Sequence, residues 1–187
     1  MNRRQLIGWL AGVSLLPSTV LAQKAATQKD PLTDSSVNDW TKLTDAQWQQ
    51  RLSRSQYEVL REEGTEPPFS SELNDEKREG AYHCAGCDLP LFQSTTKYDS
   101  GTGWPSFYDV IEGAVDTRTD YKLIWPRTEY HCSRCKGHQG HVFEDGPAPT
   151  GLRYCNNGVA LRFVPAFTSK DAASTGKSKS VEMTSKL

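Results

Sequence analysis

Cys84-Ala85-Gly86-Cys87 and Cys132-Ser133-Arg134-Cys135 are two C-x-x-C pairs that together contain four of the five cysteines in the chain. Such pairs supply the four thiolates that a tetrahedral zinc ion binds, and small residues inside them let backbone N–H groups turn toward the sulfurs. The sequence therefore predicts one structural zinc ion per chain, bound by Cys84, Cys87, Cys132 and Cys135. Two disulfide bonds, or a redox-active dithiol, are the alternative interpretations.

The segments around the two pairs have the short, apolar or alternating pattern of β-strands. We expect strands at residues 82–84, 107–111, 123–125, 129–132, 152–155 and 159–163. Asn157-Gly158 lies between the last two segments and predicts a hairpin turn there. The fold class that follows is mainly β, with antiparallel sheets and a zinc site that joins distant parts of the chain.

Helix signals are confined to the N-terminal side of these strands. Thr44-Asp45-Ala46-Gln47 is typical of a capping box, which predicts a short helix with Trp48 and Leu52 on one face. A second helix is expected to begin at Ser53 or Ser55 and to end near Gly64.

Length and composition suit a single globular domain. The chain has 187 residues, of which 36% are hydrophobic and 24% are charged, so a hydrophobic core can form. The formal net charge is −1, and neither nucleic acid nor an acidic membrane surface is therefore expected as a partner. No feature of the sequence indicates an obligate oligomer, and we expect a monomer.

Residues 1–22 have the features of a signal peptide. Arg3 and Arg4 form a basic start, residues 6–16 are apolar, and Val20-Leu21-Ala22 fits cleavage after Ala22. The arginine pair is also typical of a twin-arginine signal, which exports folded proteins and would let zinc bind before export. We expect a periplasmic or otherwise exported protein with no membrane segment after cleavage. An ordinary signal and an uncleaved anchor are the alternatives.

The remaining boundaries follow from composition. Residues 23–40 are polar and are expected to form a flexible leader, and residues 41–166 form the folded domain. Residues 167–187 are rich in Ser, Lys, Ala and Thr and are expected to be a disordered tail.

The fifth cysteine, Cys155, stands apart from both pairs. In a strand, Arg153 and Cys155 point to the same face, and a guanidinium beside the sulfur favours the nucleophilic thiolate. His138 and His141 are candidates for a general acid or for residues that orient a substrate. The alternatives are a buried, inert cysteine and histidines that are structural or bind zinc.

Several longer motifs, taken together, resemble the B-type methionine sulfoxide reductases. The resemblance extends over residues 43–165 and includes both C-x-x-C pairs. The motifs that carry it are Gly64-Thr65-Glu66-Pro67-Pro68-Phe69, Gly103-Trp104-Pro105-Ser106-Phe107, Gly137-His138-Gln139-Gly140-His141-Val142-Phe143, Asp145-Gly146-Pro147 and Arg153-Tyr154-Cys155-Asn156-Asn157.

The resemblance implies a reaction. This family reduces the R epimer of methionine sulfoxide, mainly in oxidised proteins and peptides. Cys155 matches the nucleophile that becomes a sulfenic acid, and His138 and His141 match the active-site histidines. Trp104 matches the residue that packs on the substrate methyl group.

Further residues are expected to complete the substrate site. Phe143 would complete its apolar side, and Asn157 matches the family's asparagine two residues after the nucleophile. Arg153 is expected there because it points to the same face as Cys155. Zinc in this family is structural and lies away from the chemistry.

The sequence departs from the family's pattern beside the Gly-Trp-Pro-Ser-Phe motif. Many members carry a resolving cysteine there, and this chain has Thr102. We therefore expect a one-cysteine cycle, in which a thioredoxin-like or low-molecular-weight thiol reduces the Cys155 sulfenic acid. Asn156 and Gly158 also differ from the aliphatic residue and the serine that are common in the family.

Two other functional classes fit parts of the sequence. A zinc-ribbon-like binding module would use the cysteine pairs as a scaffold and leave Cys155 inert. An exported thiol–disulfide exchange protein would use the C-x-x-C pairs themselves, which bound zinc would prevent.

Overall fold

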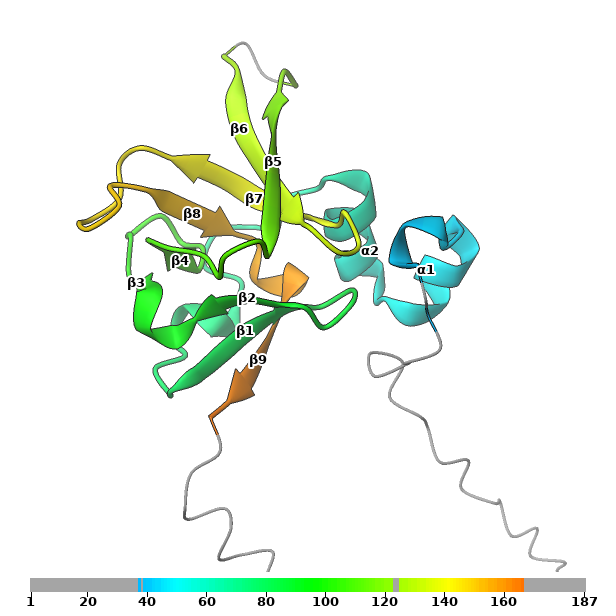
Figure 1. Ribbon diagram of the computed structural model, residues 1–187, viewed down its shortest axis with the longest axis horizontal. Helices are drawn as coiled ribbons and strands as arrows, with labels where there is room; N and C mark the ends of the chain where they lie inside the picture. Colours follow the sequence, from blue (N-terminus) through cyan, green and yellow to red (C-terminus); the bar gives the residue numbers. More distant parts are fainter. Residues whose placement is uncertain (1–36, 38, 123–124, 167–187) are drawn as a thin grey trace, which may run out of the picture.

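Figure 1 shows a computed structural model of the protein, which describes residue 37, residues 39–122 and residues 125–166. Within these residues, two α-helices come first and two antiparallel sheets follow. The predicted signal peptide, most of the predicted leader and the predicted tail lie outside the described residues. No helix among those described is long and apolar enough to span a membrane.

The two helices begin where the sequence predicts. Helix α1 is Asp45–Arg51 and helix α2 is Arg54–Glu62, and each starts with a capping box. In these boxes the hydroxyls of Thr44 and Ser53 accept from backbone N–H groups three residues later. The start after Ser53, rather than Ser55, is thus settled. Trp48 and Leu52 are buried, as their spacing predicts.

A short 3₁₀ helix precedes α1. This element, η2, is Trp40–Lys42, and the indole of Trp40 lies 5.9 Å from that of Trp48 between ring centroids. The chain therefore packs against the domain from about Trp40 onward.

Nine strands in the described residues form two sheets that confirm the predicted fold class. The three-stranded sheet has the order β2-β1-β9, in which β1 is Gly80–Cys84, β2 is Pro90–Gln93 and β9 is Leu161–Pro165. The six-stranded sheet has the order β3-β4-β8-β7-β6-β5. Its strands are Lys97–Tyr98 (β3), Ser106–Phe107 (β4), Val115–Asp120 (β5), Arg127–Cys132 (β6), His138–Phe143 (β7) and Arg153–Asn156 (β8).

The core between the sheets is aromatic. Tyr82 and Phe92 come from the small sheet and Phe107 and Tyr130 from the large one, and all four are fully buried. Phe92 stacks on Phe107 with ring centroids 4.1 Å apart, and Tyr82 meets the edge of Phe107 at 4.9 Å. Burying each such ring contributes roughly 1.5–3 kcal/mol, so this contact fixes the two sheets against each other.

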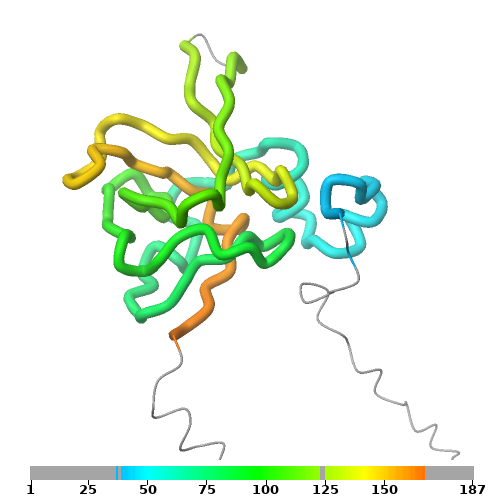
Figure 2. Tube along the Cα trace, in the orientation of Figure 1, coloured from blue at the N-terminus to red at the C-terminus, as the bar shows by residue number. Residues whose placement is uncertain are grey.

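The last strand closes the small sheet with a long-range pairing. Strand β9 runs antiparallel to β1, with Cys84 opposite Leu161 and Gly80 opposite Pro165 (Figure 2). The element η5, a 3₁₀ helix at Gly158–Ala160, links β8 in the large sheet to β9 in the small one. Helix α2 packs against η5 and β7.

The predicted hairpin at Asn157-Gly158 is wrong. Strands β8 and β9 belong to different sheets, and Gly158 begins a 3₁₀ helix. The physical reason is the buried carboxylate of Glu66, which accepts hydrogen bonds from the N–H groups of both Gly158 and Val159. Local turn chemistry is overridden by this contact from a residue far away in the sequence.

Several strand boundaries also differ from the prediction. The segment at 107–111 contributes only Phe107 to β4, and of the segment at 123–125 only Trp125 is described, outside any strand. The strand of that region is β5, whose polar residues lack an apolar pattern because it lies at a sheet edge. Strands β2 and β7 were not predicted: Pro90 and Gly140 lower the strand propensity of these segments.

Candidate active site and metal centre

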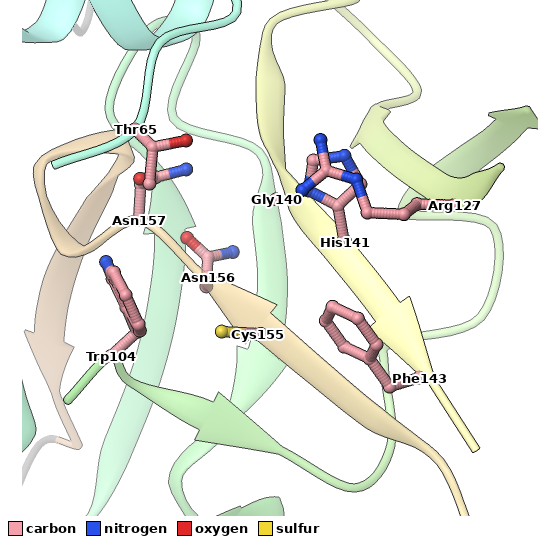
Figure 3. Close-up of a pocket in the computed structure, with 9 residues that line it drawn as sticks. All are labelled: Thr65, Trp104, Arg127, Gly140, His141, Phe143, Cys155, Asn156 and Asn157. Atoms are coloured by element: carbon pink, nitrogen blue, oxygen red, sulfur yellow. The ribbon is translucent and has the colours of Figure 1, made fainter. Parts of the chain in front are cut away.

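Cys155 lies near the middle of the large sheet. Its strand, β8, pairs with β4 on one side and β7 on the other, and Cys155 stands opposite Ser106 and His141. The side chain is half-buried and lines a cavity of about 140 Å³. The lining residues, all labelled in Figure 3, are Thr65, Trp104, Arg127, Gly140, His141, Phe143, Cys155, Asn156 and Asn157.

A glycine lets the two central strands, β7 and β8, approach each other at Cys155. A Cβ at Gly140 would lie 1.9 Å from the backbone oxygen of Cys155, which no side chain can satisfy. Gly140 therefore contributes only backbone atoms to the cavity wall, and a side chain at this position would not fit.

Two aromatic side chains form the apolar walls. Trp104 and Phe143 lie on opposite sides of the Cys155 sulfur (Figure 3). Trp104 is held by a 3.0 Å hydrogen bond from its Nε1 to the carbonyl oxygen of Glu66. The Phe143 ring lies 4.3 Å from the guanidinium carbon of Arg153. Their fixed positions suit a small apolar group held against the thiol.

Polar groups occupy the remaining wall. His141 Nε2 and Arg127 Nη2 both contact Asp120 Oδ2, at 2.8 and 2.7 Å. Arg127 Nε is buried without a protein partner among the described residues. Asn157 is buried, and its amide joins the Glu66 N–H and the Gln139 carbonyl at 3.0 Å each. The cavity thus pairs an apolar side with hydrogen-bond donors.

His138 does not line the cavity that contains the thiol. It lines a neighbouring polar cavity of about 240 Å³, which His141 and Arg127 also border. Its Nδ1 lies 2.7 Å from Glu129 Oε1, its Nε2 is buried with no protein partner in the described residues, and its ring centroid is 5.5 Å from that of His141. Of the two predicted histidines, His141 is therefore the one beside Cys155.

Arg153 also lies behind the cavity wall rather than on it. Its guanidinium makes a two-pronged ion pair with Asp145, with N–O distances of 2.8 and 2.9 Å. It supports Phe143 from behind and places a positive charge near the thiol.

Opposing effects act on the pKa of Cys155. Burial raises this pKa above its usual range, and it outweighs the Arg153 charge and the hydrogen bonds from Thr102 and Arg153, which lower the pKa. The Asp145 carboxylate raises it further. The expected effect of the guanidinium is present, but the thiol as a whole is harder to ionise than a free one.

The four remaining cysteines form a single buried cluster. Their sulfur atoms all lie within 4.8 Å of one another, with Cys84 and Cys135 at 3.6 Å and Cys87 and Cys132 at 3.5 Å. Tetrahedral zinc with Zn–S bonds of about 2.3 Å places sulfurs about 3.8 Å apart. These distances fit a four-thiolate metal site, and all five cysteines are free thiols rather than disulfides.

The two pairs have the same local geometry. In each, the residue after the second cysteine has a left-handed backbone, with φ of 62° at Asp88 and 59° at Lys136. Its N–H donates at 2.9 Å to the carbonyl of the first cysteine, Cys84 or Cys132. Helix α2 covers the cluster, since Arg61 donates at 3.0 Å to the Cys135 carbonyl.

A SelR domain model matches residues 52–165, which include both the thiol cavity and the cysteine cluster. The chain belongs to the SelR family of B-type methionine sulfoxide reductases. The predicted resemblance is thus confirmed.

Relatives in this family match the whole domain. The chain is 56% identical over 123 residues to a peptide methionine sulfoxide reductase MsrB of Thiobacillus denitrificans, covering 65% of this chain and 93% of that protein. It is 56% identical to the protein of that name in Pseudomonas putida, covering 64% and 90%. A chloroplastic peptide methionine sulfoxide reductase B1 of Arabidopsis thaliana is 42% identical over 151 residues, covering 80% and 75%.

Several site residues were not identified from the sequence, although Thr65, Glu66 and Gly140 lie in the motifs quoted above. Thr65, Arg127 and Gly140 line the cavity, and Glu66 holds two of its lining residues. A carboxylate followed by Pro-Pro gives no indication that it will be buried. Arg127 could have been noticed as a charge close to a predicted strand.

The absence of a side chain at Gly158 makes room for Ser71. A Cβ at Gly158 would lie 1.9 Å from the Ser71 hydroxyl oxygen. The space beside the turn is thus taken by the side chain of Ser71 from another segment.

Proposed function

We propose that the protein reduces the R epimer of methionine sulfoxide in oxidised proteins and peptides, with Cys155 as the nucleophile. The observation that supports this most directly is the position of its sulfur between Trp104 and Phe143, with His141 and Arg127 on the polar wall (Figure 3). The methyl group would pack on the aromatic side and the sulfoxide oxygen would face the donors. Such a two-sided cavity can distinguish the epimers.

The reduction of the sulfoxide consumes one proton. The Cys155 thiolate attacks the sulfoxide sulfur, the oxygen takes a proton and passes to Cys155, and methionine leaves as the thioether. His141 is the proposed donor of that proton, since it lines the cavity and is fixed by Asp120. Burial lowers the pKa of His141, which makes the imidazolium a stronger acid.

His138 is proposed to support this step from behind. Glu129 is buried against it. Burial raises the pKa of Glu129, but hydrogen bonds from His138 and Arg118 help to outweigh burial and hold that pKa well below its usual range. A carboxylate that stays ionised fixes the His138 ring and can stabilise a positive charge on the histidine pair.

An external thiol is proposed to complete the cycle. Thr102 hydrogen-bonds the Cys155 thiol at the position where many relatives carry a resolving cysteine, and the other four cysteines lie in the buried cluster. A donor thiol would attack the sulfenic acid, releasing water and forming a mixed disulfide, which a second thiol would reduce. A thioredoxin-like protein or a low-molecular-weight thiol could serve.

Zinc is the metal we propose for Cys84, Cys87, Cys132 and Cys135. Four buried thiolates whose sulfurs lie within 4.8 Å of one another would repel each other, and a divalent soft-to-borderline cation offsets their charge. Its role is structural because all four ligand positions are filled by protein. Metal analysis of the purified protein tests this assignment, and a protein free of zinc with four titratable thiols in the cluster would contradict it.

The cellular site is a separate proposal. The basic and apolar pattern of residues 1–22 supports export to the periplasm, by the twin-arginine route or the ordinary one. Fractionation of cells that express the natural chain or the double variant R3K/R4K tests it, because a twin-arginine route fails when lysines replace both arginines. Recovery of full-length protein in the cytoplasm in both cases would contradict export.

One assay tests the proposed reaction. Purified protein is given a peptide with racemic methionine sulfoxide and dithiothreitol, and the loss of each epimer is followed. We expect loss of the R epimer alone, abolished by Cys155→Ser. Persistence of the R epimer would favour the binding-module alternative, and disulfide exchange activity that depends on the C-x-x-C pairs would favour the third class.

A further inference from the structure

A path of buried hydrogen bonds connects the cysteine cluster to the residue next to the nucleophile. Gln139 Nε2 donates to Cys84 Sγ at 3.4 Å. Asn156 Nδ2 lies 3.5 Å from Gln139 Oε1 and 2.8 Å from the hydroxyl of Tyr130. We call Gln139 and Asn156 the amide chain; both are at most 1% exposed.

Two neutral amides in a core are costly unless they are hydrogen-bonded, so their presence there needs an explanation. An aliphatic side chain at position 156 could not hydrogen-bond Gln139 or Tyr130, as Asn156 does. The amide nitrogen of Asn156 on β8 thus has polar partners on β7 and β6, whereas its Oδ1 is buried without a protein partner among the described residues.

Gln139 holds the catalytic segment through its backbone as well. Its carbonyl oxygen accepts from the Asn157 backbone N–H at 2.9 Å and from Asn157 Nδ2 at 3.0 Å. The same residue therefore contacts Cys84 on one side and the two residues that follow Cys155 on the other.

We propose that Gln139 and Asn156 are positioning residues that couple the metal at the four-cysteine site to Cys155. A donor to a metal-bound thiolate affects the electron density and orientation of that ligand. A displacement of the Gln139 side chain would move Asn156 through their hydrogen bond, and Asn156 follows Cys155 directly in the chain. The inference rests on the metal site and on the nucleophile assigned under the proposed function.

Coupling of this kind must act in both directions. A change at Cys155 should alter the metal site, and this can be measured without an activity assay. Cobalt(II) in place of zinc absorbs light through its thiolate bonds, so its spectrum reports on Cys84. Iodoacetamide should modify Cys155 alone, because the metal protects the other four thiols.

In the cobalt-loaded wild-type protein, we expect alkylation of Cys155 to shift the thiolate-to-cobalt absorption band. In Gln139→Met, which keeps the length of the side chain but removes the N–H donor, the shift should vanish. Asn156→Val breaks the next link and should have the same result. The double variant should resemble either single one, because both act on one path.

Metal affinity gives a second readout. Loss of an outer hydrogen bond to a metal ligand lowers metal affinity about 10- to 100-fold, so Gln139→Met should release zinc to a chelator about tenfold more readily. Asn156→Val should lie between Gln139→Met and the wild type. Far-ultraviolet circular dichroism and urea unfolding show whether each variant is folded, and Gln93→Met on β2 is a control for the change of side chain.

The outcomes are distinguishable. An unchanged cobalt band after alkylation of the wild type, or an equal shift in folded Gln139→Met, would overturn the coupling, as would a failure to bind cobalt. Alkylation that leaves reductase activity intact would instead contradict the role of Cys155. A shift in the wild type that is lost in both folded variants supports the amide chain as the link.

Discussion

Glu66 and Trp104 are joined by a hydrogen bond of 3.0 Å from the indole Nε1 to the Glu66 carbonyl oxygen. The N–H of Glu66 donates at 3.0 Å to Oδ1 of Asn157, which lines the same side of the cavity as Trp104 (Figure 3). The backbone of Glu66 therefore holds both Trp104 and Asn157 in place. The buried carboxylate of Glu66 in turn fixes this backbone by accepting hydrogen bonds from the N–H groups of Gly158 and Val159.

Glu66→Ala should therefore loosen both of these residues. The change leaves the buried N–H of Gly158 and the partly buried N–H of Val159 without acceptors, which costs about 1–3 kcal/mol for a buried group and less for a partly buried one. We expect a lower urea midpoint and a KM that rises more than kcat falls, because the loosened residues hold substrate rather than react. Glu66→Gln retains an acceptor and should have a smaller effect. The exposed Glu72→Gln is the control, and equal losses in Glu72→Gln and Glu66→Ala would contradict the role.

Thr102→Cys should convert the enzyme to a two-cysteine cycle. The Thr102 side chain lies close enough to the Cys155 thiol to lower its pKa, so a cysteine at this position is expected to reach a sulfenic acid at Cys155. After one equivalent of sulfoxide without reductant, the variant should lose two thiols and the wild type one, with the metal retained in both. Loss of two thiols in the wild type would contradict the one-cysteine cycle.

Arg153→Met and Asp145→Asn should move the pKa of Cys155 in opposite directions. The Arg153 charge lowers this pKa and the Asp145 charge raises it, so removing Arg153 raises it and removing Asp145 lowers it. For each rise of about one in the pKa, alkylation of Cys155 at neutral pH slows about tenfold. The rate of iodoacetamide reaction against pH measures this, and shifts of the same sign would refute the electrostatic account.

Gly140→Ala should disrupt the centre of the large sheet. The added methyl would lie 1.9 Å from the backbone oxygen of Cys155, so the pairing of β7 with β8 must shift. A loss of more than about 3 kcal/mol in unfolding free energy is expected. Gly113→Ala, with no atom within 4 Å and a φ of +70°, should cost about 1–2 kcal/mol. Similar urea midpoints for the two variants would show that the stability of the sheet does not depend on the close approach of β7 and β8 at Gly140.

The sequence correctly predicted features whose signal lies within a few neighbouring residues or within a long motif. The capping boxes at Thr44 and Ser53 depend on residues three positions apart, and each C-x-x-C pair has a spacing that is typical of metal ligands. Both features could therefore be predicted from the sequence alone. Glu66 could not, because its burial depends on η5, which lies far along the chain. The turn at Gly158 was mispredicted for the same reason.

The assignment of site residues shows the same division. Trp104, Phe143, His141 and Asn157 all line the thiol cavity as their motifs suggest. His138 belongs to the same motif but lines the neighbouring cavity and not the thiol cavity. On a regular strand, residues three apart point to opposite faces, so alternation predicts that the two histidines are separated. The register shift opposite His131, which alternation does not predict, accompanies a separation of only 5.5 Å between the two ring centroids.

Cys155 lies on β8, which is paired on both sides, and this position determines the order in which substrate and reductant bind in the proposed cycle. Its backbone is held by β4 and β7, so the sulfur cannot swing out to meet a second partner. Methionine sulfoxide and the reducing thiol must both come to it through the cavity bordered by Trp104 and Phe143. The thioether product must therefore depart before the reductant arrives, and initial-rate plots at several donor concentrations should give the parallel lines of a ping-pong enzyme.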